Sequence, residues 1–182
     1  MKKNIHPDYH EITVNIKDGS TTKWQIAHLD SGASYNETAL QFERTYDYIR
    51  ENQAKWWKAE HDLVGDDVPV IAYYHIPQNE SQMAWDLMEE GNTTDVTKHK
   101  FNNYEHFSQS EEHAQEFFDI AKDHGLKAEF YGHDHANDWT VDYKGVTIGY
   151  GVKTGKELYY SKVTKEDAAT YYGLDEAFDL MG

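Results

Sequence analysis

Lys127-Ala-Glu-Phe-Tyr-Gly-His-Asp-His-Ala-Asn-Asp138 is the stretch of sequence that decides the fold. Its first residues predict a strand, and Gly132 permits the chain to turn sharply before His133 and His135. Residues 110–124, just upstream, predict a helix with an N-cap serine, early acids and a glycine stop. A helix followed by a strand is typical of α/β sheets, which bind ligands beyond the carboxyl ends of their strands. We therefore expect both histidines at such an edge.

Outward from this stretch, periodicity and turn residues predict one α/β domain. Asp18-Gly19 is a strong hairpin signal, because glycine adopts positive φ at little cost. The apolar run 68–74 predicts a strand that is buried on both faces, and 91–109 predicts a long loop. The other expected elements are strands at 11–16, 22–29, 138–141, 146–150 and 158–163, and helices at 46–60, 81–90 and 165–182.

Composition limits the classes of partner. The 182 residues include 33 acids and 17 bases, for a net charge of −16, which disfavours nucleic acids and anionic membranes. A phosphate substrate would need bound cations to reverse the local field. The chain has no cysteine, so a metal would take histidine, carboxylate or amide ligands. The start lacks an apolar signal region and no stretch reaches membrane-spanning length, so a cytoplasmic location is the default expectation. Secretion is expected instead if the native start was trimmed.

Three histidines are the predicted metal ligands. His133 and His135 are spaced i and i+2 on a tight turn, so both imidazoles can face one small volume. His75 ends the strand at 68–74, directly before Ile76-Pro77, and so occupies the same kind of strand exit as His133. The exits of neighbouring strands meet, and neutral imidazole is a good ligand for transition metals. The alternative is that these histidines belong to ordinary polar loops.

Five segments, in order, resemble the C-terminal half of a calcineurin-like metallophosphoesterase. The resemblance is nearest to the branch related to purple acid phosphatases, and it extends over roughly residues 9–155. Each segment alone is a weak signal, and their shared order makes the resemblance specific. The segments are Trp24–Gly32, Tyr48–Trp57, Tyr74–Pro77, Gly132–Asp138 and Tyr150–Gly155.

The resemblance implies a metal centre and an activity. His75 and His133 would bind one ion and His135 the other, with Asn137 and Asp138 beside the site, touching ligands or substrate. The ions would be Mn, Fe or Zn, two in a completed site. The implied function is metal-dependent hydrolysis of a phosphate ester, as a phosphatase or phosphodiesterase. The implied fold is half of an αββα sandwich, a mixed sheet flanked by helices.

The N-terminal metal motifs of that family have no match in this chain. Asp8-Tyr9-His10 has the spacing of the first motif but lacks the strand before it, and Gly65-Asp66-Asp67 lacks the second spaced acid of the next. No Gly-Asn-His occurs, so the family's general-acid histidine has no counterpart and we assign no catalytic residue. Residues 1–164 are therefore expected to form a partial domain, with 165–182 as an acidic tail. We predict that the isolated chain is weakly active or inactive.

Several alternatives stay open. One ion could bind all three histidines, or the chain could be a non-catalytic metal-binding or oligomerising remnant, or a product without function. Half of a two-sheet sandwich should expose an apolar sheet face, so we expect either a homo-oligomer or a complementing N-terminal half. Separately, residues 1–14 resemble the opening of bacterial large-subunit ribosomal protein thirty-one.

Overall fold

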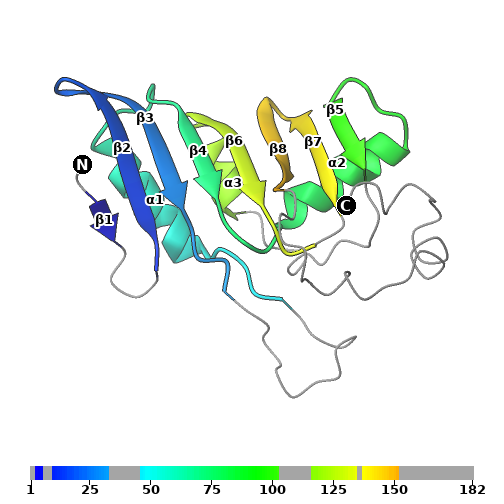
Figure 1. Cartoon of the computed structure of the whole chain (residues 1–182), viewed down its shortest axis with the longest axis horizontal. Helices are drawn as coiled ribbons and strands as arrows, with labels where there is room; N and C mark the ends of the chain where they lie inside the picture. Colours follow the sequence, from blue (N-terminus) through cyan, green and yellow to red (C-terminus); the bar gives the residue numbers. More distant parts are fainter. Residues whose placement is uncertain (1–2, 6–9, 33–45, 103–115, 135–136, 152–182) are drawn as a thin grey trace, which may run out of the picture.

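The structure is a computed structural model in which eight strands form a single mixed sheet (Figure 1). The described residues are 3–5, 10–32, 46–102, 116–134 and 137–151. The strands are β1 (Lys3–Ile5), β2 (Ile12–Asp18), β3 (Thr21–His28), β4 (Val70–Tyr73), β5 (Val96–Asn102), β6 (Leu126–Tyr131), β7 (Asp138–Tyr143) and β8 (Val146–Tyr150).

The middle of the sheet is parallel and its two flanks are antiparallel. The strand order is β1-β2-β3-β4-β6-β8-β7-β5. Strands β3, β4, β6 and β8 run parallel to one another, so their carboxyl ends share one edge. The predicted α/β class with a mixed sheet is confirmed.

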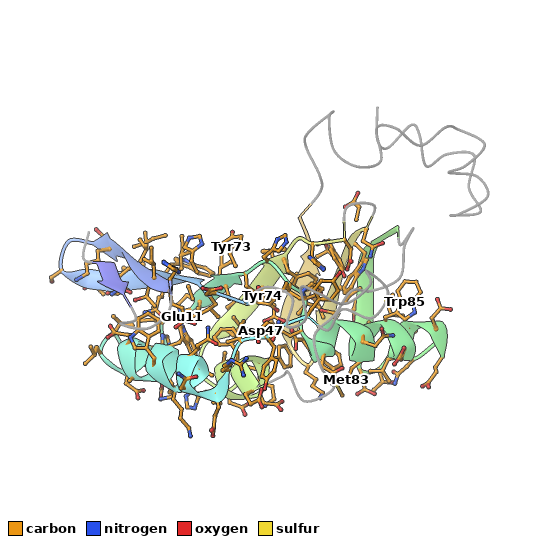
Figure 2. All side chains as sticks on the ribbon, turned by 90° about the horizontal axis from the view of Figure 1, so that it is seen from below. Glu11, Asp47, Tyr73, Tyr74, Met83 and Trp85 are labelled. Carbon is orange, nitrogen blue, oxygen red and sulfur yellow. The ribbon has the colours of Figure 1, made fainter. Side chains whose placement is uncertain are left out.

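Three helices lie in the described part of the chain, all on the same face of the sheet (Figure 2). None of them is long and apolar enough to cross a membrane. Their contact with the sheet buries Trp57 and Phe117 completely or nearly so, with ring centroids 5.2 Å apart. The helices are α1 (Glu51–Asp62), α2 (Asn79–Glu89) and α3 (Glu116–Ala121).

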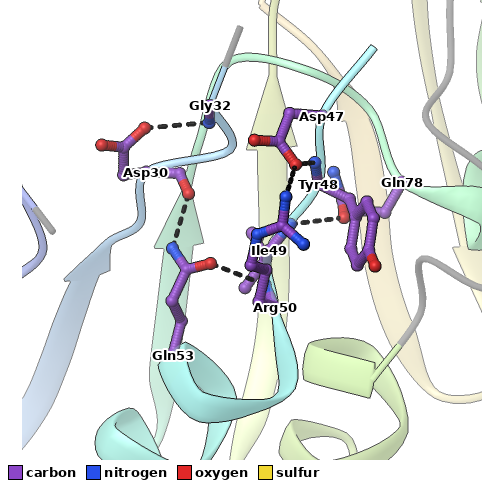
Figure 3. A network of polar contacts seen from close by, with 8 residues as sticks. All are labelled: Asp30, Gly32, Asp47, Tyr48, Ile49, Arg50, Gln53 and Gln78. Carbon is purple, nitrogen blue, oxygen red and sulfur yellow. Dashed lines mark hydrogen bonds and ion pairs between the residues drawn. The ribbon is translucent and has the colours of Figure 1, made fainter. Parts of the chain in front are cut away.

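The first helix begins later than its aromatic spacing predicts. We expected helix from residue 46, but α1 starts at Glu51 after an extended Arg50. Side chains bind the backbone N–H groups that a longer helix would use. Arg50 N donates to Gln53 Oε1 at 2.6 Å, and Ile49 N donates to Gln78 Oε1 at 3.0 Å (Figure 3). These tertiary partners override the local periodicity.

Two further expectations about strands were wrong. The segment expected to be a loop at 91–109 contains β5, which pairs with β7 at the edge of the sheet. Edge strands are often polar, so an apolar pattern could not reveal it. Strand β4 was expected to be buried on both faces, yet Tyr73 is 39% exposed. The expected strand at 158–163 and the tail at 165–182, with its domain boundary, lie outside the described residues.

Candidate metal centre

His75 and His133 meet at the carboxyl edge of the parallel strands, as the sequence predicts. His75 follows β4, His133 follows β6, and these strands are hydrogen-bonded neighbours. The pairing continues past both strands, because Gly132 N donates to the carbonyl of His75 at 3.1 Å. As a result, His133 Nδ1 lies 3.3 Å from His75 Nε2, with the two rings nearly perpendicular.

The separation of the two nitrogens suits a shared ion. Zinc binds imidazole at about 2.0–2.1 Å, so two nitrogens on one tetrahedral ion lie about 3.3 Å apart. A hydrogen bond between a neutral imidazole pair has a similar length. The pair can therefore hold either a proton or a cation between its rings, and the donor set fits a transition metal.

A tight turn aims His133 at its partner. His133 has φ of 73°, which is uncommon for a residue with a side chain. The N–H of Asp134 donates to the carbonyl of Gly132 at 2.9 Å, which closes a three-residue γ-turn with His133 at its centre. This turn is strained, and such strain concentrates at functional sites.

The loop that carries His75 is fixed from two sides. Ser31 Oγ accepts hydrogen bonds from the backbone N–H groups of His75 and Ile76, at 3.2 and 2.8 Å. Gln78 then donates to the carbonyl of Ile76 at 2.8 Å. Ser31 is 2% exposed, so these bonds form in a dry environment where they constrain the loop strongly.

Two supporting residues of the site were missed by the sequence analysis. The ring of Tyr46 meets the ring of His133 edge-on, with centroids 4.4 Å apart. Ser31 supports His75 across 44 positions of the chain. Ser31 lies just after β3, within the segment Trp24–Gly32 that carries part of the family resemblance and was a usable signal, whereas no sequence motif indicates a role for Tyr46.

The structure describes two of the other three predicted site residues. Asn137 is buried beside the hydroxyl group of Tyr150, and Asp138 is half-buried at the start of β7. Both lie toward the predicted edge of the sheet. His135 lies outside the described residues. Among the described residues, no three histidine or acidic side chains gather as a metal site, so the described centre is a pair.

Asp134, between the two predicted histidine ligands, is bound into the core instead. It is 4% exposed and accepts a short hydrogen bond from the hydroxyl of Tyr150. The ring of Tyr150 packs edge-on against Tyr131 and Trp139. These contacts hold the loop after β6 to the sheet and so support the turn at His133.

Two buried carboxyl groups lie on the helix side of the sheet, near this edge. Tyr74, which precedes His75, donates to Glu80 Oε1 at 2.9 Å, and Glu129 lies in β6 with no exposed surface. Burial raises the pKa of Glu80 to about 7. Burial and the neighbouring Glu80 raise the pKa of Glu129 well above its ordinary value. The pair therefore keeps at least one proton at neutral pH.

Comparison with known proteins gives two similarities. Over 150 residues the chain is 26% identical to an Arabidopsis thaliana protein named "Probable inactive purple acid phosphatase 28", a match covering 77% of this chain and 33% of that protein. Over 32 residues it is 50% identical to "Large ribosomal subunit protein bL31" of Rhizorhabdus wittichii, covering 18% of this chain and 42% of that protein. No protein-family model and no solved structure matches.

The chain thus spans about a third of the length of its phosphatase-like relative. The similarity is distant and agrees with the predicted relationship to metallophosphoesterases. The printed name of that relative describes it as inactive. The second similarity agrees with the resemblance noted for the first residues of the chain.

Proposed function

We propose that this chain carries one part of a metal-dependent phosphoester-hydrolase centre. The supporting observation is the convergence of His75 Nε2 and His133 Nδ1, 3.3 Å apart, on the exits of two neighbouring parallel strands. His135 would supply the third imidazole of the centre. Asn137 and Asp138 would adjust the ligands or touch the substrate from the same edge of the sheet.

Each residue has a defined task in this proposal. His75 and His133 hold one ion in their neutral forms, and Ser31 keeps the His75 loop in register with β6. A bound ion supplies Lewis acidity and a water of lowered pKa, which is the chemistry that phosphoester hydrolysis needs. The ion also offers an anionic ester a local positive field within a chain of net charge −16.

The centre is incomplete in this chain. Transition metals of this kind generally take about 4–6 ligands, more than three imidazoles give to two ions. No bridging carboxylate, amide ligand or general-acid histidine has a sequence match here. The isolated chain should therefore hydrolyse phosphate esters weakly or not at all, unless another polypeptide supplies the remaining groups.

A second candidate function is metal binding without catalysis. It is favoured by the missing motifs and by the name of the relative, which includes the word inactive. In this case the histidines would retain an ion as a structural or sensing group. The two candidates share the same ligands and differ only in turnover.

Metal binding can be tested with matched histidine variants. We expect His75→Ala and His133→Ala each to weaken zinc or manganese binding by at least about tenfold in calorimetry. His124→Ala is the control, because His124 pairs with Asp66 at 3.2 Å, away from the paired imidazoles. Equal affinities in His133→Ala and His124→Ala would remove the proposed centre.

Turnover then tests whether the isolated chain is catalytic without a complement. A chromogenic phosphate ester is supplied with saturating Mn, Fe or Zn. We expect rates far below the roughly 1–1000 per second of ordinary enzymes. Turnover within that range, lost in His133→Ala, would show that the chain needs no complement.

A further inference from the structure

The sheet has a second face on which no described helix packs. Figure 2 shows the helices on one side of the sheet and labels Tyr73 on the other side, opposite Tyr74 and Glu11. We call this second side the open face. It is formed by alternate residues of β2, β3, β4 and β6, beginning with Ile12, Trp24, Ile71 and Ala128.

Apolar side chains cross the open face in rows. The strand register places Val14, Ile26, Ile71 and Ala128 side by side on four successive strands. All four are half-buried by their neighbours within the sheet and are covered by no described helix. The row therefore behaves as a continuous apolar strip rather than as scattered surface residues.

A second row is aromatic. His28, Tyr73 and Phe130 are register partners on β3, β4 and β6. His28 stacks on Tyr73 with centroids 5.5 Å apart, and Tyr73 lies 5.9 Å from Phe130. Exposed aromatic rows of this kind are enriched at the centres of protein interfaces.

The alternation along β2 is opposite to that of a sheet with one solvated face. Thr13 and Asn15 are buried beneath the helices, whereas Ile16 is 45% exposed and its partner Trp24 is 39% exposed. An antiparallel flank with one wet face normally turns its polar residues outward. The buried face of β2 is polar and its surface-facing residues are apolar, which indicates a further layer over the open face.

Charge favours a second copy of the same chain as that layer. The two rows and the Ile16–Trp24 pair contain no acidic side chain, although acids outnumber bases 33 to 17 overall. Two chains of net charge −16 repel least where they meet through such a surface. A strongly basic partner would find no acid within these rows to bind, because the acids Asp138 and Asp142 of this face lie on β7.

Shape and extent also suit a copy of this chain. Two twisted sheets pack face to face with their strands nearly aligned, which permits two-fold symmetry. Beyond the rows, Thr147 continues the face on β8, and Thr140 with the acids Asp138 and Asp142 continues it on β7 as a polar, acidic rim. The apolar rows span four strands spaced about 4.8 Å apart, a small area that predicts a dimer of modest affinity.

We propose that the open face packs against the same face of a second copy, giving a homodimer with two sheets inside and helices outside. The dimer would form without metal, so the inference stands apart from the proposed hydrolase centre. The carboxyl edge of the open face lies next to the histidine pair, because His75 and His133 follow β4 and β6 directly.

Sedimentation between about 1 and 100 micromolar tests the dimer. We expect the wild type to shift from monomer to dimer across this range. Ile16→Lys and Trp24→Lys should each weaken the dimer by at least about tenfold, since each places a charge in the apolar surface that the dimer would bury. Leu63→Lys is the control, because Leu63 is 77% exposed just beyond α1 and lies off the open face. A wild type that is monomeric throughout, or equal weakening by Leu63→Lys, overturns the proposal.

A covalent readout keeps the test valid even if a charged variant folds poorly. A photoreactive p-benzoylphenylalanine replaces Tyr73, and in a second protein it replaces Leu63. Illumination of each purified protein should cross-link two copies of the chain only when the photoreactive residue is at position 73. An adduct within a single chain, an adduct only with another added protein, or copy-to-copy adducts from both positions would overturn the second copy as occupant.

Discussion

At β2 and β3, the two faces of the sheet reverse the usual distribution of polar and apolar residues. Under the helices, Asn15 and Gln25 are buried and share a hydrogen bond of 3.1 Å. Gln53 of α1 reaches the same layer and donates to Glu11 Oε1 at 2.7 Å. On the opposite face, Trp24 and other large apolar groups lie at the surface.

The reversal shows that strand periodicity fixes which residues share a face but not which face is covered. A buried amide or carboxyl group is tolerated when it finds a hydrogen-bond partner, because the partner offsets the cost of desolvation. Exposed apolar area costs only about 25 cal/mol per Å². Side-chain networks under the helices can therefore outweigh the hydrophobic preference of a single strand.

The largest expected difference between the faces comes from a pair of tryptophans. Trp57→Ala should lower the free energy of unfolding by about 3–5 kcal/mol, because Trp57 is fully buried and stacks on His61. Trp24→Ala on the open face should cost less than about 1 kcal/mol in dilute protein. Urea denaturation measures both, and equal losses would mean that the two faces are equally covered in the monomer.

The pH dependence of stability tests the buried acids of the helix-covered face. Because burial raises the pKa of Glu80 from 4.5 to about 7, the folded chain binds protons that the unfolded chain releases. The titration of Glu80 alone should lower the free energy of unfolding by about 3 kcal/mol as the pH rises from 4.5 through 7. The fall should continue at higher pH through Glu129, whose pKa is raised further.

Glu129→Gln should reduce that fall, because it removes a second acid whose pKa burial raises in the folded chain. Burial also raises the pKa of Glu11 to about 7, so the free energy of unfolding of this variant should still depend on pH. Glu89→Gln, on the exposed end of α2, serves as the control and should leave the profile unchanged. Stability that rises between pH 5 and 8 would contradict this account of the acids.

A pair of glutamines gives an intermediate effect. Gln53→Ala should cost about 1–3 kcal/mol, because Gln53 bonds Glu11, Arg50 N and the carbonyl of Asp30 from a buried position (Figure 3). Gln82→Ala removes an exposed bond to Asp86 and should change stability by less than about 0.5 kcal/mol. Comparable losses of stability for the two variants in thermal melts would show that the buried hydrogen bonds stabilise the fold no more than the exposed one.

The smallest expected effect compares adjacent residues of β2 that face opposite ways. Thr13 is fully buried and its hydroxyl has no hydrogen-bond partner among the described residues, so Thr13→Val should stabilise the fold by about 1 kcal/mol. Val14→Thr, on the open face, should change the stability of the monomer by less than about 0.5 kcal/mol. A destabilised Thr13→Val would indicate a buried partner for that hydroxyl.

The sequence predicted the parts of the site that depend on local order. A strand, a glycine and a histidine in succession were enough to place His133, and the same logic placed His75 beside it. The residues that the prediction missed contact the histidines or their loops from segments that are distant in the sequence. Tyr46 packs on His133 from a segment that was expected to be helical, and its contact depends on the side chains that delay α1.

The buried acids and the polar edge strand were beyond prediction for similar reasons. Glu80 and Glu129 lie 49 positions apart and share an environment only because the fold brings the start of α2 to the Glu129 side chain. Strand β5 takes its conformation from pairing with β7 rather than from an apolar pattern. His135, the third predicted ligand, lies outside the described residues and stays a prediction.

The two paired imidazoles are separated by 58 positions in the chain, which sets an order of events during synthesis. When β4 leaves the ribosome, α2, β5, α3 and β6 have still to be made, and at about 5–20 residues per second that takes several seconds. A nascent chain that ends just after β4 contains only one imidazole of the pair. Under the proposed function, both imidazoles could bind one cation only after β4 and β6 have paired, so metal binding would report that this pairing is complete.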